Sequence, residues 1–131
     1  MELKQVTAII RTDVLKDVEN RLKQLGVPGI TVTRVKGFGE YANFLTPDWM
    51  SAYAQIEIFT DTTQADQIVE GIVKTAHTGT AGDGIVVVLP VDKVYRIRDD
   101  RELHSLHGAN AGEDANQSRA EFLTSGGTHA R

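Results

Sequence analysis

The chain has 131 residues, a length typical of one domain that can bury a substantial core. The absence of cysteine excludes disulfides, thiolate zinc sites and a cysteine nucleophile, and the net charge of -4, without any long basic run, argues against nonspecific nucleic-acid binding. Because there is neither an apolar run near 18 residues nor a pattern typical of a secretory signal, we expect a cytoplasmic protein that does not insert into a membrane.

The N-terminal quarter of the chain predicts a strand followed by a helix. Residues 6–10 alternate between apolar and polar side chains, as in a half-buried strand. The apolar residues of segment 14–25 then follow helical spacing. Thr12 or Asp13 is the expected N-cap of this helix, and Gly26 is expected to end it.

The middle of the chain predicts two strands and a second helix. Segments 30–36 and 52–59 are alternating and rich in β-branched residues. Asp61 offers a helix start, the apolar stripe of residues 65–76 fits a helix packed on a core, and Gly79 is expected to close it.

The end of the patterned region predicts a last strand and then a tail. Residues 85–89 form a continuous apolar run, which predicts a central strand buried on both faces, and Pro90 should end its pairing. Residues 91–98 predict a short final strand. Residues 99–131 hold few large apolar side chains, so we expect a C-terminal tail that is partly disordered or folded over the body.

The order strand, helix, strand, strand, helix, strand is that of the α+β ferredoxin-like fold, written βαββαβ. It places residues 1–98 in one domain. Both helices would cover one face of the sheet and leave the other bare. We therefore expect a homo-oligomer.

Two glycine-rich segments and an arginine pair indicate an anion site. The first segment is 35–40, and the second, called the glycine loop below, is 78–84. Glycines allow close approach of the backbone to a ligand, although a helix end with a tight turn would also need them. Arg96 and Arg98 would project from one face of the final strand and suit a phosphate or carboxylate, unless they form a solvated edge.

The segments ITVTRVKGFGE, QIEIF, IVKTAHTGTAGDG and VDKVYRIRD resemble the nitrogen regulatory PII signalling proteins, and the resemblance covers residues 1–98. It implies a homotrimer without a prosthetic group, with adenine nucleotides in clefts between subunits. It also implies a T-loop, here residues 40–52, that contacts a regulated protein. The implied nucleotide contacts are Thr31, Gly37, Phe38, Gly39, Glu57, Thr78, Gly79, Gly82, Asp83, Gly84, Arg96 and Arg98. The implied partner contacts are Tyr41, Phe44 and Trp49, although Trp49 could also pack on its own domain.

Four departures from the family pattern refine the function that the resemblance implies. Ile85 and Glu40 stand where nitrogen-branch members carry cations for the nucleotide phosphates. A charge-assisted contact contributes about 1.5–3 kcal/mol, so ADP or AMP should bind in preference to ATP. Tyr41 and Tyr53 replace the Gln and Lys that hold Mg-ATP and 2-oxoglutarate, which argues against a nitrogen sensor.

The T-loop is also short and lacks the tyrosine that enteric members uridylylate near its tip. This pattern resembles the PII-like branch linked to inorganic carbon, including carboxysome-associated members. The resemblance implies sensing of adenylates together with bicarbonate, and a partner in carbon uptake or the carboxysome.

Two other functions remain open. A slow adenine-nucleotide hydrolase could use the same cleft, with Asp83 or Glu40 as its carboxylate, although Asp83 also suits a turn cap. A metal-tolerance protein of the same fold would need His104 and His107 as ligands, and this pair is a weak signal. The charged residues 99–102 are expected to be solvated.

Overall fold

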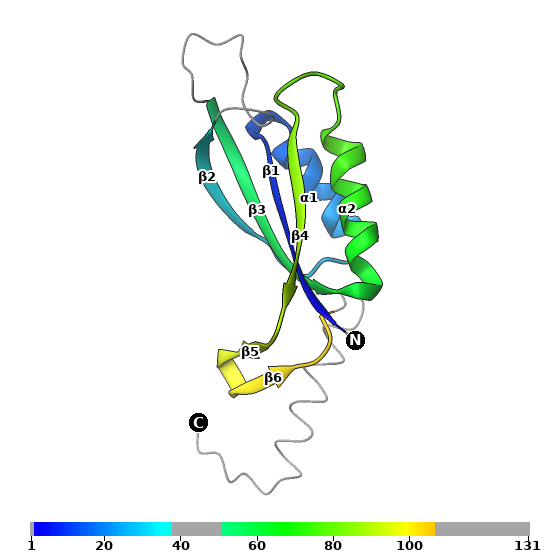
Figure 1. Cartoon of the computed structure of the whole chain (residues 1–131), viewed down its shortest axis with the longest axis vertical. Helices are drawn as coiled ribbons and strands as arrows, with labels where there is room; N and C mark the ends of the chain where they lie inside the picture. Colours follow the sequence, from blue (N-terminus) through cyan, green and yellow to red (C-terminus); the bar gives the residue numbers. More distant parts are fainter. Residues whose placement is uncertain (1, 38–50, 107–131) are drawn as a thin grey trace, which may run out of the picture.

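The computed structural model describes residues 2–37 and 51–106 and confirms the ferredoxin-like fold (Figure 1). Its antiparallel sheet has the order β2-β3-β1-β4 and consists of β1 (Leu3–Arg11), β2 (Thr31–Gly37), β3 (Ser51–Asp61) and β4 (Gly84–Val91). The helices α1 (Leu15–Gln24) and α2 (Thr62–Ala76) cover one face of this sheet. A separate two-stranded sheet contains β5 (Val94–Arg96) and β6 (Arg101–Leu103), and short 3-10 helices occupy Thr12–Val14 and Ile97–Asp99.

The core lies between the sheet and the two helices. Val6 on β1 and Ile56 on β3 are fully buried, as are Leu22 on α1 and Ile72 on α2. Burying each such side chain contributes roughly 1.5–3 kcal/mol, which is why the period-two and helical patterns locate these elements.

Helix α1 ends as predicted but does not begin as predicted. Gly26 has φ 83°, and its N–H donates to Lys23 O at 3.0 Å while Val27 N–H donates to Leu22 O at 3.0 Å. This pair of bonds is a Schellman C-cap, which confirms Gly26. The cap prediction for Thr12 or Asp13 is wrong, because both residues form the 3-10 turn that leads into α1 and neither makes a capping bond.

Helix α2 begins as the sequence predicts. Asp61 is buried, and its Oδ1 accepts a hydrogen bond from Thr63 N at 3.0 Å. The helix ends at Ala76, three residues before Gly79, because the chain turns out of helical conformation at His77. No helix among residues 2–37 and 51–106 is long and apolar enough to span a membrane.

Strand β4 differs from its prediction. It pairs only with β1 and is therefore an edge strand of this sheet, not a central strand buried on both faces. Its pairing also continues through Pro90, which lies opposite Lys4. An edge strand tolerates proline because one side of its backbone has no ladder partner.

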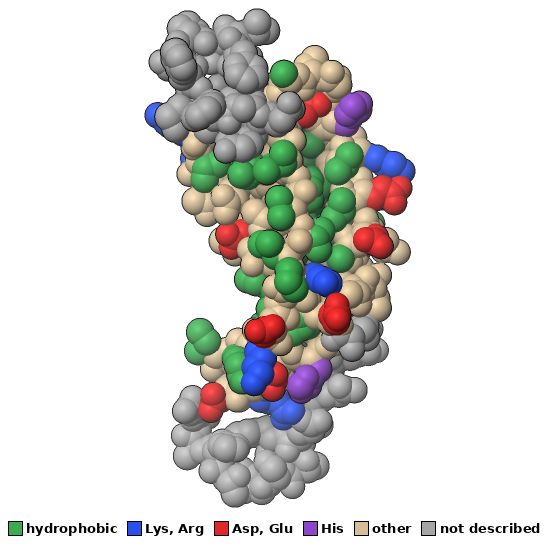
Figure 2. Space-filling view, viewed as in Figure 1, with side chains coloured by type: hydrophobic (Ala, Val, Ile, Leu, Met, Phe, Trp, Pro, Cys, Tyr) green, Lys and Arg blue, Asp and Glu red, His purple; other side chains and the backbone are tan. Residues whose placement is uncertain are grey.

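The face of the sheet opposite the helices carries exposed apolar side chains. They are 37–46% exposed and comprise Phe59, Ile85, Val87 and Leu89. Apolar side chains gather along β4 in Figure 2. The arrangement agrees with the bare face that underlies our expectation of a homo-oligomer.

The first residues of the predicted tail fold back onto the domain. Strand β6 pairs with β5, so this hairpin extends beyond residue 98, where the sequence predicted the domain to end. Further on, the Asp61 Oδ2 atom accepts hydrogen bonds from Leu106 N at 3.2 Å and Ser105 Oγ at 3.3 Å. Residues 107–131 lie outside the described part of the chain, so the expectation for them stays a prediction.

Candidate functional site

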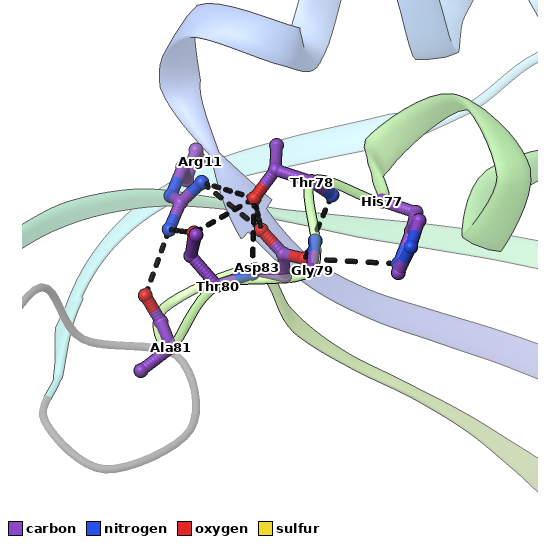
Figure 3. A network of polar contacts seen from close by, with 7 residues as sticks. All are labelled: Arg11, His77, Thr78, Gly79, Thr80, Ala81 and Asp83. Atoms are coloured by element: carbon purple, nitrogen blue, oxygen red, sulfur yellow. Dashed lines mark hydrogen bonds and ion pairs between the residues drawn. The ribbon is translucent and has the colours of Figure 1, made fainter.

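The glycine loop is organised around Arg11, the last residue of β1 (Figure 3). One terminal nitrogen, Nη1, donates to Thr78 Oγ1 at 3.1 Å and contacts Asp83 Oδ1 at 3.0 Å. The other, Nη2, donates to Thr80 Oγ1 at 3.1 Å and to the Ala81 carbonyl at 2.8 Å. Every one of these partners is an acceptor, so Arg11 acts as a strut that holds the loop in shape.

Asp83 completes this network from inside the loop. Its Oδ2 atom accepts hydrogen bonds from Thr78 N at 2.8 Å and Gly79 N at 2.9 Å, and its Oδ1 atom accepts one from the Thr78 hydroxyl. Partial burial alone would raise the pKa of Asp83, but these hydrogen bonds and the Arg11 charge outweigh it and lower the pKa to about 2. The residue therefore caps the turn, and its low pKa makes it a poor general base for a hydrolase.

The backbone of the loop requires glycine at its junction with β4. Gly84 has φ 108°, and a Cβ atom placed there would lie 1.9 Å from the Ile9 carbonyl oxygen. Glycine at this position lets the loop enter β4 directly against β1. The strand and the loop that Arg11 braces are thereby joined without an intervening linker.

A small pocket beside the loop holds about 170 Å³. Its lining includes His77, Asp83 and Gly84. Small-molecule pockets usually span about 300–1,000 Å³. The pocket that the described part of one chain forms here thus has only a fraction of the volume of a usual small-molecule site.

Thr31 and Glu57 lie together elsewhere on the sheet. They face each other across β2 and β3, in a row that continues to Thr7 on β1. Glu57 is partly buried and accepts a hydrogen bond from Gln55 Nε2 at 3.0 Å. The row places a carboxylate and two hydroxyls on the face opposite the helices.

The structure does not bring the two arginines to the glycine loop. Arg96 is the last residue of β5 and Arg98 lies in the following 3-10 turn, so the prediction that both project from one strand is wrong. The reason is that the strand predicted over 91–98 spans only three residues. The arginines and the loop lie at opposite ends of β4, whose eight residues span roughly 25 Å (Figure 1).

Arg96 is also occupied within its own turn. Its side chain forms an ion pair with Asp99, so the prediction that residues 99–102 are simply solvated is wrong. The turn closes over Asp100, whose φ of 57° is left-handed.

Several predicted contacts lie outside the described residues. They comprise Phe38, Gly39, Glu40, Tyr41, Phe44, Trp49 and His107. Gly37 is the last residue of β2, and His104 is exposed. Within residues 2–37 and 51–106, no group of three or more His, Cys, Asp or Glu side chains could hold a metal ion.

Sequence reasoning missed Arg11, which makes three hydrogen bonds and one ion pair to the loop. The signal was available, because the ferredoxin-like order puts the end of the first strand beside the start of the last. Arg11 also lies opposite Tyr53 on β3, a residue that is 1% exposed. Burial raises the pKa of Tyr53, although the charge of Arg11 and a hydrogen bond with it oppose that shift.

Comparisons with known proteins agree with this fold. The family model "Nitrogen regulatory protein P-II" matches residues 3–101. A nitrogen regulatory protein P-II of Pasteurella multocida is 36% identical over 107 residues, which cover 76% of this chain and 96% of the relative. That of Synechocystis sp. is 38% identical over 103 residues, which cover 73% and 92%.

A solved structure gives the same result. Arabidopsis thaliana PII bound to citrate matches with a TM-score of 0.69 and 30% identity, over 81% of this chain and 91% of that one. The family model covers the whole four-stranded sheet and both helices. The chain therefore belongs to the nitrogen regulatory protein P-II family, a family of regulatory proteins.

Proposed function

We propose that this chain is a homotrimeric PII-like signalling protein that senses adenylates together with bicarbonate. The nucleotide would bind between subunits, and segment 40–52 would contact a regulated partner in inorganic-carbon metabolism. The observation that carries the proposal is the position of the two groups of residues that we expect to bind phosphate. The braced glycine loop and the arginines lie at opposite ends of β4, so a second copy must supply one of them.

The exposed apolar residues of β4 and β3 support such an assembly. Val87 and Leu89 are 38% and 41% exposed on the bare face of the sheet, where a neighbouring subunit would bury them. Burying apolar surface is the main driving force for association of this kind.

The contacts of Arg11 support a preference for ADP or AMP over ATP. Ile85 stands directly after the glycine loop, where the nitrogen-branch pattern has a lysine. Arg11 is a cation beside this loop that could replace it, but both of its terminal nitrogens already bind acceptors of the loop. The cleft would therefore lack the positive charge that a third phosphate needs.

The position of Tyr53 supports bicarbonate, and not 2-oxoglutarate, as the second ligand that the protein would sense. This buried phenol, beside Arg11, takes the place of the lysine that pairs with a dicarboxylate in the nitrogen branch. Without that lysine, 2-oxoglutarate would leave one carboxylate unpaired, which is costly in a partly buried site. Bicarbonate is smaller and carries a single charge, so it avoids this cost.

Isothermal titration calorimetry tests the proposal. The protein is titrated with AMP, ADP and ATP, each with and without bicarbonate, and in parallel with magnesium and 2-oxoglutarate. We expect ADP or AMP to bind more tightly than ATP, with an affinity that bicarbonate changes. Tight ATP binding that magnesium and 2-oxoglutarate enhance would instead indicate a nitrogen sensor, and steady phosphate release from ATP would indicate a hydrolase.

A pair of matched variants locates the site. Arg98→Ala removes an arginine of the proposed cleft and should weaken ADP binding about tenfold. Arg34→Ala removes the same charge from an exposed position on β2 and should leave the affinity close to wild type. Equal effects of the two changes would argue that the arginines act only through net charge.

A further inference from the structure

The ion pair between Arg96 and Asp99 uses the edge of the guanidinium that suits an oxyanion. Arg96 Nε donates to both carboxylate oxygens at 3.1 Å, and Nη2 donates to Oδ2 at 2.5 Å. The side chains are 21% and 23% exposed, so the pair is partly shielded from water. This forked geometry is the one that arginine offers to phosphate as well as to carboxylate.

The local backbone favours the pair. Asp99 ends a 3-10 turn that starts directly after Arg96, so the two side chains are three residues apart and come to lie on the same side. The hydrogen bond from Arg96 is the main cause that lowers the pKa of Asp99, despite some opposing desolvation. The carboxylate is thus ionised at neutral pH and competes as a full negative charge.

We propose that Asp99 is a specificity-determining residue that competes with ligand phosphate for Arg96 and so disfavours nucleotides with more phosphates. The inference rests on the proposed adenylate site and deepens it. To reach the forked edge of Arg96, a phosphate must displace the Asp99 carboxylate, which then remains nearby as a like charge. The repulsion grows with the charge of the ligand and is therefore largest for ATP and smallest for AMP.

A purely structural role for Asp99 makes a different prediction. Arg96 lies directly opposite Arg101 in the β5–β6 hairpin, and like charges in that position repel each other. If Asp99 only offsets this repulsion, its removal should lower stability and weaken all nucleotides alike. If Asp99 competes with phosphate, its removal should change their ratio.

The test compares three variants by calorimetry with AMP, ADP and ATP. Asp99→Asn removes the charge while keeping the shape, and should raise ATP affinity about tenfold, ADP affinity about threefold and AMP affinity little. Asp99→Glu keeps the charge and should stay close to the wild-type ratio. Asp92→Asn is the matched control, because it removes the same charge from an exposed position between β4 and β5.

Circular dichroism and sedimentation of each variant check that fold and assembly persist. An unchanged ATP-to-ADP ratio in Asp99→Asn, with wild-type protein that binds nucleotide, overturns this inference and leaves the proposed function standing. A uniform loss for all three nucleotides also overturns it and assigns Asp99 a structural role. If neither the wild type nor Asp99→Asn binds any of the three, the proposed function and the inference both fall.

Discussion

Replacing Gly84 with alanine tests the account of how the glycine loop joins β4. The added Cβ atom would lie 1.9 Å from the Ile9 carbonyl oxygen, whereas ordinary contacts begin at 3.4 Å. One of the two backbones must therefore move by about 1.5 Å. Because the obstacle is the backbone of β1 and not a flexible side chain, a rotamer change cannot relieve the overlap.

Two costs add up in Gly84→Ala. A residue other than glycine at φ 108° costs about 1–3 kcal/mol. Separating β4 from β1 at the Ile10–Gly84 pair weakens neighbouring ladder hydrogen bonds, each of which contributes about 1 kcal/mol. We expect the free energy of unfolding to fall by about 3–5 kcal/mol.

Gly79→Ala is the matched control within the same loop. Gly79 has φ 84°, but a Cβ atom there would meet only the His77 ring, at 3.8 Å. It should therefore show the backbone cost alone, about 1–2 kcal/mol. Urea unfolding followed by circular dichroism measures both variants at one protein concentration, because assembly would make stability depend on concentration. Differences below about 1 kcal/mol are within the error of such measurements. If the two variants lose stability to within that limit of each other, the close approach of Gly84 to β1 is not the reason that this position needs glycine.

Two further predictions concern carboxylates. The pKa of Asp83 is about 2 in the folded chain against an ordinary 3.8, so its contribution to stability is fully present above about pH 4 and is lost as the pH falls towards 2. Acid unfolding curves of the wild type should show this loss of stability, and those of Asp83→Asn should lack the pH-dependent part that Asp83 contributes. Asp61→Ala removes the N-cap of α2 and the acceptor of the Leu106 N–H, and should lower the stability measured by thermal unfolding by about 1–2 kcal/mol. Asp66→Ala, on the exposed side of the same helix, is the control and should cost under about 0.5 kcal/mol. Similar losses in the two variants would contradict the capping role.

The elements that the sequence predicted best are those with a strong period and a definite end. Residues 6–10 and 52–59 have one face buried under the helices, so their alternation locates them without ambiguity. Asp61 and Gly26 mark helix ends by local chemistry, namely a side-chain acceptor and a positive φ, which depend on few distant contacts.

The errors arose where the neighbours of a segment decide its structure. The apolar run 85–89 has the composition of a buried central strand, but its place at the sheet edge follows from topology and not from composition. The spacing of Arg96 and Arg98 fits the period of a strand, but the strand ends at Arg96. The chain then turns, with the Arg96–Asp99 ion pair across the turn and Asp100 in the left-handed conformation. Arg11 has no sequence neighbour in the loop that it braces, so only the fold relates them.

These ion pairs bear on how an anion site is judged from sequence. Counting cations suggested that Arg96 and Arg98 would both be available to a ligand, and that two other positions lacked their charge. In the structure Arg11 is neutralised by Asp83 and Arg96 by Asp99. A phosphate that approaches either arginine must exchange one anion for another instead of meeting an unpaired charge. The net gain from each exchange is smaller than that from a fresh ion pair, because the released carboxylate stays close by. The affinity for nucleotides, and the preference among AMP, ADP and ATP, should therefore depend on the carboxylates at positions 83 and 99 as much as on the arginines themselves.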